Sequence, residues 1–395
     1  MNILIVASKF PPEYSGPGVR IPKLYKAISN DIDAGKISVL CGGIEYTVNE
    51  NYNYEGLNVR RVVPSYVRAR KFPFNLLPKA FFEAAVSFAE NIAANAALKT
   101  YKDVDMLHVF GTSGITSAAI HWAGARNIPV FQELVTAKAS PKQRYMLFGT
   151  TKPSDKCVIV TMQEEAKKRC RAAGFENQIW HRPNPFKEDL FHPVKPSEKQ
   201  ALRKSLTPFC DDDIILLTVA KLMPQKNQIF LIDVLRNLDE RFKLVIAGPK
   251  VEQGPLYKRD MAYLNAIKQE IKDQNLESRV HLITAYVESH AYMKAADIYV
   301  LPAYDEGFGT PMMEAVACGL PVVANGDEPS FIEWLSEGQN GFLRPLNPTK
   351  WAEACGFAAS IPMEKRLDEA KKIVNLAGQT HIYNAYIDKI RGLTS

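Results

Sequence analysis

Short apolar runs rich in β-branched residues recur along the chain, and stretches with helical spacing separate them. Continuous runs of this kind are typical of parallel strands covered on both faces, and the intervening helices complete βαβ units. The predicted strands are 2–7, 37–41, 58–63, 105–109, 128–132 and 157–160, followed by 214–220, 242–247, 279–283, 297–301, 321–324 and 341–343. The pattern therefore predicts an α/β protein with two doubly wound parallel sheets.

The two series of strands are separated by residues 180–199, which carry four prolines and show neither a helical nor a strand period. Proline fixes the backbone and removes an amide donor, so this segment is interpreted as a semi-rigid linker. We predict an N-terminal domain over 1–185 and a C-terminal domain over 186–374. A helical, amphipathic segment covers 363–393, and its part at about 375–395 is expected to pack back on the first domain.

Composition narrows the class of protein. With 395 residues, 46% of them hydrophobic and 23% charged, the chain is long enough for two domains and unlike disordered sequences. Its 49 basic and 43 acidic residues leave a net charge of +6, which is too weak a bias to indicate a nucleic-acid binder. Six cysteines without metal or disulfide spacing, and no leader or spanning run, favour a cytoplasmic protein.

A turn that leads into a helix follows the predicted strand 297–301. Gly307 and Gly309 allow a tight backbone turn, Thr310 suits the N-cap, and Pro311 suits the first helical position. Free amides and the positive end of the helix dipole make such a terminus an anion site. The sequence therefore predicts a phosphate or diphosphate site at this helix.

Two glutamates flank the turn. Glu306 in the loop is placed to accept hydrogen bonds from sugar hydroxyls, and Glu314, one turn into the helix, from a ribose. Together with 318–324, the stretch 306–315 resembles the E-G-F-G-x-x-x-x-E-A signature of the retaining, nucleotide-sugar-dependent glycosyltransferases of family 4. The resemblance implies the GT-B fold, in which two Rossmann-like domains face each other across a cleft.

The stretch 217–227 extends the resemblance, because Lys221 and Lys226 occupy the positions of an Arg and a Lys that bind the donor diphosphate in that family. Lysine keeps the charge of arginine but not its bidentate geometry. The resemblance implies a UDP- or GDP-sugar as co-substrate, with no further cofactor. It gives the donor-binding residues as Gly16, Gly18, Gly248, Thr284, Tyr286, Gly307, Phe308, Gly309, Thr310 and Glu314.

No metal site is predicted. Asp211, Asp212 and Asp213 invite comparison with the D-x-D motif of other glycosyltransferases, but they precede a strand, away from the expected cleft. A solvated turn is the better interpretation, because the two lysines can stabilise a departing diphosphate without a metal ion.

The N-terminal half departs from the family at one point. Many members carry a histidine just after the strand that corresponds to 128–132, where it contacts the reacting sugar, and this sequence has none. Either Glu133 or Thr136 takes that role, or the role is absent. His108 matches another histidine common in the family and is a candidate on the acceptor side. The alternative for His108 is a structural hydrogen-bonding group.

Basic and aromatic residues mix over 60–82, which is the composition of a surface that rests on an anionic bilayer. The alternative is a solvated loop before a core helix with Phe81, Phe82, Val86 and Phe88 facing inward.

The sequence thus predicts a retaining glycosyltransferase of cell-surface polysaccharide or glycolipid synthesis, with Glu306, Lys226, Lys221 and Glu133 as its catalytic candidates. Its expected partners are a nucleotide-sugar and a hydroxyl acceptor, for which a lipid-linked glycan at the inner membrane face is one candidate, and no nucleic acid. Two alternatives stay open, a sugar-nucleotide epimerase of the same fold and a two-domain sugar-binding protein.

Overall fold

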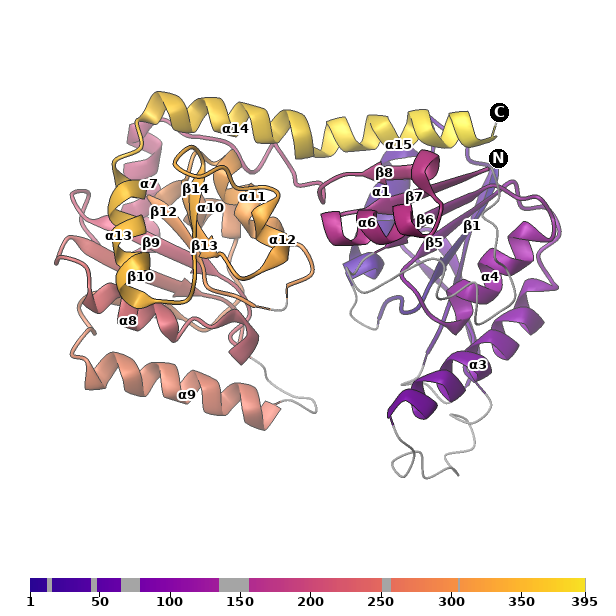
Figure 1. Cartoon of the computed structure of the whole chain (residues 1–395), viewed down its shortest axis with the longest axis horizontal. Coiled ribbons are helices and arrows are strands. Elements are labelled where there is room, and N and C mark those ends of the chain that lie inside the picture. The colour runs from indigo at the N-terminus through magenta and orange to yellow at the C-terminus, as the bar shows by residue number, and fades with distance from the viewer. Residues whose placement is uncertain are drawn as a thin grey trace. The chain divides into compact units, whose positions relative to one another are not determined.

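A computed structural model describes residues 1–12, 16–43, 48–64, 79–134, 156–250, 257–304 and 306–394. The chain folds into two compact units, each with its own sheet flanked by helices (Figure 1). The first unit comprises Met1–Arg182 and Tyr383–Ser395, and the second comprises Pro183–Ile382. None of the helices in the described ranges combines the length and apolar composition that crossing a membrane requires.

The first unit contains an eight-stranded sheet in the order β3-β4-β2-β1-β5-β6-β7-β8. All neighbouring strands are parallel except β3, which runs antiparallel to β4. Its strands are β1 (Asn2–Ala7), β2 (Lys36–Cys41), β3 (Glu50–Tyr54), β4 (Leu57–Arg61), β5 (Met106–Phe110), β6 (Val130–Leu134), β7 (Cys157–Thr161) and β8 (Ile179–His181). Its helices are α1 (Gly16–Ile28), α3 (Lys79–Leu98), α4 (Gly114–Gly124), α6 (Glu164–Ala172) and most of α15 (Gln379–Thr394).

Helices α3 and α4 cover one face of the first sheet. Leu4, Val6 and Leu40 on that face are buried in one apolar cluster with residues of both helices. A capping box fixes the start of α4, in which the Ser113 side chain accepts from the Thr116 amide and the Thr116 hydroxyl accepts from the Ser113 amide. Doubly wound sheets of this kind bind ligands at the carboxyl ends of their strands.

The second unit contains a six-stranded, fully parallel sheet in the order β11-β10-β9-β12-β13-β14. Its strands are β9 (Ile214–Val219), β10 (Phe242–Ala247), β11 (Val280–Ile283), β12 (Ile298–Leu301), β13 (Val322–Asn325) and β14 (Gly341–Arg344). Its helices are α7 (Pro196–Leu206), α8 (Phe230–Arg236), α9 (Tyr257–Asp273), α10 (Ser289–Ala295), α11 (Thr310–Ala317), α12 (Pro329–Ile332), α13 (Pro348–Ala359) and α14 (Met363–Ala377). The strand order reverses between β9 and β12, which is where sheets of this topology bind ligands.

All twelve predicted strands are present, and the structure contains two further strands that were not predicted. Strand β3 and strand β8 both lie at edges of the first sheet. The interpretation of 180–199 as a segment without regular structure is wrong at both ends, because β8 reaches His181 and α7 begins at Pro196. The predicted terminal helix is in fact two, since the chain turns at Gly378 between α14 and α15.

Candidate functional site

Two loops meet where the strand order of the second unit reverses. Lys226 lies in the loop after β9, Glu306 lies in the loop after β12, and the Tyr304 amide joins the loops by donating to the Gln225 carbonyl at 3.1 Å. The Lys226 ammonium forms an ion pair with the Glu306 carboxylate. The side chain of Lys226 is 22% exposed and that of Glu306 is 13% exposed, so a ligand can reach both.

A third carboxyl supports this pair. The amide of Glu306 donates to Glu328 Oε2 at 3.1 Å, and the other carboxylate oxygen of Glu328 accepts from the amide and hydroxyl of Ser330. Sequence reasoning missed Glu328, although it follows a buried strand as the other site residues do. Its contacts show that it holds the backbone of the Glu306 loop.

Helix α11 begins beside this loop. Gly309 is its N-cap, with φ of 74°, and a Cβ there would lie 2.5 Å from Cε1 of Phe331. Both the backbone conformation and the close contact require glycine at this position. The prediction that Thr310 is the N-cap is wrong by one residue, because Thr310 is the first helical residue, and its hydroxyl accepts from the Asn184 side-chain amide at 3.3 Å.

Phe308 and Gly307, which belong to the stretch 306–315, differ in exposure. Phe308 is buried and packs against Trp334, with ring centroids 5.6 Å apart, so its side chain belongs to the core. Gly307 is exposed, and its position has open space around it. Backbone amides here are therefore better placed than the phenyl ring to meet a ligand.

A pocket of about 180 Å³ opens next to α11. Tyr286 is 78% exposed and forms part of its wall, whereas Thr284 does not line it. A Cβ at Gly248 would lie 1.9 Å from the Ala220 carbonyl oxygen, so the close approach of the β9 and β10 loops requires glycine there. The lining residues are Val219, Ala220, Lys221, Gly248, Pro249, Tyr286, Val287, Ser289, Met293, Pro311 and Glu314.

Glu314 projects into this pocket from α11. Burial raises the pKa of its carboxyl to about 7, since no described cation forms an ion pair with it. A protonated carboxyl keeps one acceptor oxygen, whereas the ionised form offers two, so a ligand that donates two hydrogen bonds favours the ionised form.

Glu133 in the first unit lies at the centre of a buried polar cluster. Its carboxylate is 3.3 Å from the guanidinium nitrogens of Arg182 and Arg20, and it accepts a hydrogen bond from the Tyr386 hydroxyl. Burial on its own raises the pKa of this carboxyl, but Arg182, His108 and Arg20 outweigh burial and hold the pKa well below its usual range. Glu133 is thus ionised and enclosed, which suits a positioning residue and not a proton acceptor.

His108 belongs to the same cluster and is fully buried. Its Nε2 is 3.4 Å from Glu133, and its Nδ1 is 2.6 Å from the Tyr25 hydroxyl. Burial lowers the pKa of His108, so the ring is neutral, with Nε2–H toward the carboxylate and Nδ1 accepting from Tyr25. Arg20, with a side chain 28% exposed, is the cluster's most accessible member.

Two further predicted residues of the first unit, Gly16 and Gly18, follow the carboxyl end of β1. Both glycines lie in the first turn of α1. Thr136 lies outside the described residues. Arg20, Arg182 and Tyr386 were missed, because the sequence gives no sign that a strand-end glutamate will meet residues so far along the chain.

Comparison with known proteins agrees with these observations. Residues 199–373 match the family model described as glycosyl transferases group 1. A D-inositol 3-phosphate glycosyltransferase of Mycobacteroides abscessus is 28% identical over 45% of this chain and 40% of its own length. The chain thus matches less than half the length of this curated relative, and the match does not extend to the family 4 assignment or to retention.

Solved structures match nearly the whole chain. Anabaena HepE in complex with UDP has a TM-score of 0.70 at 16% identity, over 99% of this chain and 100% of that one. Sucrose-phosphate synthase from Thermosynechococcus elongatus has a TM-score of 0.68 at 16% identity, over 99% and 98%. At these identities the likeness concerns the fold, and the predicted GT-B fold class is confirmed.

Proposed function

We propose that the protein is a retaining glycosyltransferase that transfers a sugar from a UDP- or GDP-sugar to a hydroxyl acceptor. The observation that carries the proposal is the Lys226–Glu306 pair at the reversal of strand order, inside the region that matches the group 1 glycosyl transferases. The UDP in the HepE structure supports a nucleotide-sugar donor. The inositol-phosphate glycosyltransferase among the relatives supports a hydroxyl acceptor.

The proposed chemistry rests on leaving-group stabilisation. Lys221, Lys226 and the amides at the start of α11 face the donor diphosphate and offset the charge that develops on it. Glu306 orients the donor sugar, and Glu314 accepts from the ribose hydroxyls. The bond from the anomeric carbon to the diphosphate breaks as the bond to the acceptor oxygen forms on the same face, and the diphosphate takes the acceptor proton.

Donor consumption tests this proposal against the two alternatives. Each UDP- and GDP-sugar is incubated with the protein, with and without hydroxyl acceptors, and the nucleotide and sugar products are followed. A transferase releases nucleoside diphosphate in proportion to the acceptor glycosylated, an epimerase converts the sugar without an acceptor, and a binding protein leaves the donor intact. Either of the last two results would refute the proposal.

Glu314→Gln should stabilise the free protein at pH 8 and weaken nucleotide binding. The folded-state pKa of Glu314 is raised to about 7, so its stabilising protonated form is lost as pH rises through that value. Glutamine removes the buried charge, and the rise in pKa from 4.5 to about 7 corresponds to a gain of about 3 kcal/mol, or ~6–12 °C in Tm. Differential scanning calorimetry at pH 5 and pH 8 measures the gain, which should appear only at pH 8.

The same glutamate gives nucleotide binding a pH dependence. In the proposed complex both ribose hydroxyls donate to Glu314, which favours the ionised carboxylate. Binding below pH 7 then releases a proton, and affinity rises with pH until Glu314 is ionised in the free protein. Titration calorimetry at pH 6.5 in two buffers of different ionisation enthalpy detects that proton. Glu353→Gln, at an exposed site on α13, is the matched control. If the Glu314→Gln variant releases as many protons on nucleotide binding as wild type does, Glu314 is not the group that titrates.

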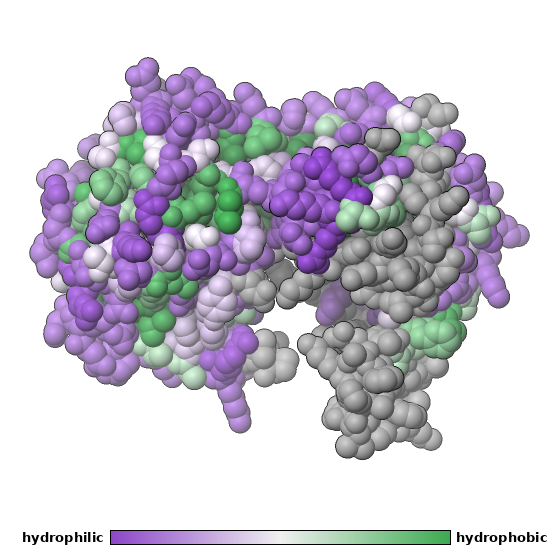
Figure 2. All heavy atoms as spheres, viewed as in Figure 1, coloured by the Kyte–Doolittle hydropathy of each residue, from purple (hydrophilic) through white to green (hydrophobic). Residues whose placement is uncertain are grey.

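We also propose that α3 brings the first unit to an anionic membrane that carries the acceptor. Most of 60–82 lies outside the described residues, but Phe88 and Ile92, one turn apart on α3, are 62% and 56% exposed. Phe88 does not face inward, contrary to the alternative prediction of a core helix. Figure 2 shows hydrophobic surface over the part of the first unit where Figure 1 places α3.

Replacing both Phe88 and Ile92 by serine should lower the partition coefficient onto anionic vesicles by about 10²-fold. Each side chain is more than half exposed and so contributes roughly 1–2 kcal/mol when it leaves water, and every 1.4 kcal/mol is a factor of ten. Co-sedimentation with phosphatidylglycerol vesicles measures the loss. Phe357→Ser, at a residue 59% exposed in the second unit, is the matched control. Equal recovery of wild type and the double variant would refute this membrane contact.

A further inference from the structure

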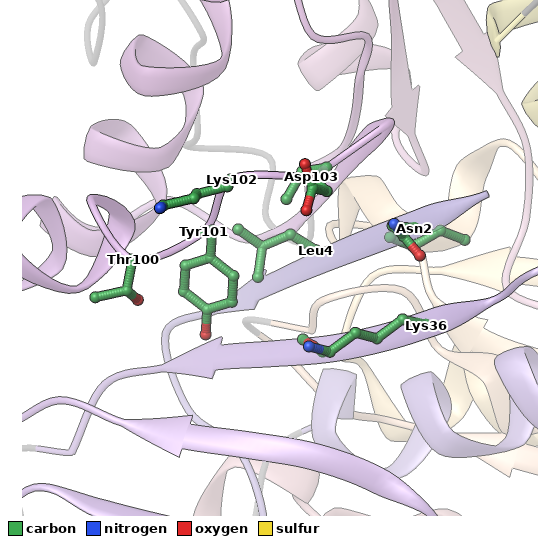
Figure 3. Close-up of a pocket in the computed structure, with 10 residues that line it drawn as sticks. Asn2, Leu4, Lys36, Thr100, Tyr101, Lys102 and Asp103 are labelled. Atoms are coloured by element: carbon green, nitrogen blue, oxygen red, sulfur yellow. The ribbon is translucent and has the colours of Figure 1, made fainter.

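A groove lies on the part of the first sheet that contains β1, β2 and β4, which is here called the wing. The groove begins at the amino-terminal ends of β1 and β2, opposite the carboxyl ends of the strands. Its deeper part, of about 250 Å³, lies between the starts of β1 and β2 and the loop after α3, and Figure 3 shows Tyr101 pointing from that loop toward the strands. A shallower part, of about 520 Å³, continues over β4. Both parts share Lys36, Ser38, Thr100 and Tyr101, so they form one continuous surface, here called the wing groove.

The sheet register explains why this surface is polar. Leu4 pairs with Ser38, and Ser38 pairs with Asn58, so these side chains lie on the same face. Further along the strands that face is covered by α3 and α4, but α3 ends at Leu98 and leaves the strand starts uncovered. The loop that follows α3 then forms one wall of a hollow floored by polar side chains.

Cations gather in the wing groove. Lys36, Arg60 and Lys102 line it, Asp103 is the acid among its lining residues, and the formal sum of these four charges is +2. Arg60 donates to the Thr100 hydroxyl at 2.8 Å, which fixes its guanidinium group. Within the described part of the chain, neither Lys36 nor Lys102 lies within 4.0 Å of a carboxylate.

We propose that the wing groove binds a phosphorylated sugar at a site separate from the donor pocket. A phosphate monoester carries about −2 charge at neutral pH, which matches the +2 of the lining residues. Ser38, Asn58 and the Tyr101 hydroxyl supply the neutral donors and acceptors that sugar hydroxyls need. The shallower part, of about 520 Å³, has by itself the volume of a small-molecule site.

Titration calorimetry with a panel of hexose 1- and 6-phosphates, the free hexoses and inorganic phosphate tests the proposal. At least one hexose phosphate should bind about tenfold more tightly than inorganic phosphate or its own free hexose, because the groove recognises both parts. Lys36→Ala and Lys102→Ala, both at exposed positions, should each weaken that binding by about tenfold. Lys26→Ala, on the exposed side of α1, should not.

Lys226→Ala separates this site from the donor pocket and from the proposed transferase activity. The hexose phosphate should bind this variant as tightly as wild type, even where transfer is lost. The proposal is overturned if no hexose phosphate exceeds inorganic phosphate, if both groove variants bind like wild type, or if binding disappears in Lys226→Ala.

Discussion

Lys226→Ala should lower the rate of sugar transfer by about 10²–10³-fold while the protein stays folded. The ammonium group is the partly exposed cation of the Glu306 pair, and it lies where the strand order reverses. In the proposed reaction it offsets negative charge that grows on the diphosphate in the transition state, so its loss should act mainly on kcat. Initial rates of nucleoside diphosphate release at saturating acceptor measure the effect.

Controls distinguish a lost charge from a disturbed fold. Lys258→Ala, at an exposed position of α9, should keep full activity, and calorimetric Tm values should agree for both variants. Since Lys226 and Glu306 contact each other, the double variant with Glu306→Ala should be less impaired than the product of the single effects. Activity of folded Lys226→Ala within about threefold of wild type would refute the role of this lysine in catalysis.

The sequence predicts most of the fold because the central strands are nearly continuous apolar runs. Strand β3 was missed because its residues, Glu50–Tyr54, contain no aliphatic side chain and lie at an edge, where only one neighbour pairs with them. Strand β8 was missed because it has only three residues and prolines follow it closely. At Gly378 the helical pattern continues across the break, so periodicity alone cannot separate α14 from α15.

The candidate site shows the same division between local and distant signals. Glycines, a helix start and strand-end charges are local features, and they predicted the loops that carry Lys226 and Glu306. The environment of Glu133 depends on partners remote in sequence, since Tyr386 lies 253 residues away. Nothing in its local sequence distinguishes an enclosed carboxylate from one that faces a substrate, and burial is therefore the property that the structure adds.

Glu133→Gln should destabilise the first unit by about 3–5 kcal/mol, which is the usual cost of breaking a buried ion pair. The neutral amide removes the carboxylate charge that lies 3.3 Å from the Arg182 guanidinium, whose side chain is only 3% exposed. It also weakens the link from β6 to α15 through the Tyr386 hydroxyl. Thermal and urea unfolding should show a fall in Tm of roughly 10 °C. Glu165→Gln, which removes an exposed ion pair with Arg169 on α6, should cost only about 0.5 kcal/mol.

Lowering the pH tests the stabilising role of Glu133 in a second, independent way. The pKa of Glu133 is lowered in the folded protein, so its contribution to stability is present above the pKa of an unfolded glutamate, about 4.3, and is lost as pH falls further. The stability difference between wild type and Glu133→Gln should therefore be constant from pH 6 to 8 and shrink below about pH 4.

If Glu133→Gln is no less stable than Glu165→Gln at pH 7, the buried cluster does not hold the first unit together. If instead the folded variant loses transfer at unchanged Tm, Glu133 acts on the substrate and not through Arg20 and Arg182.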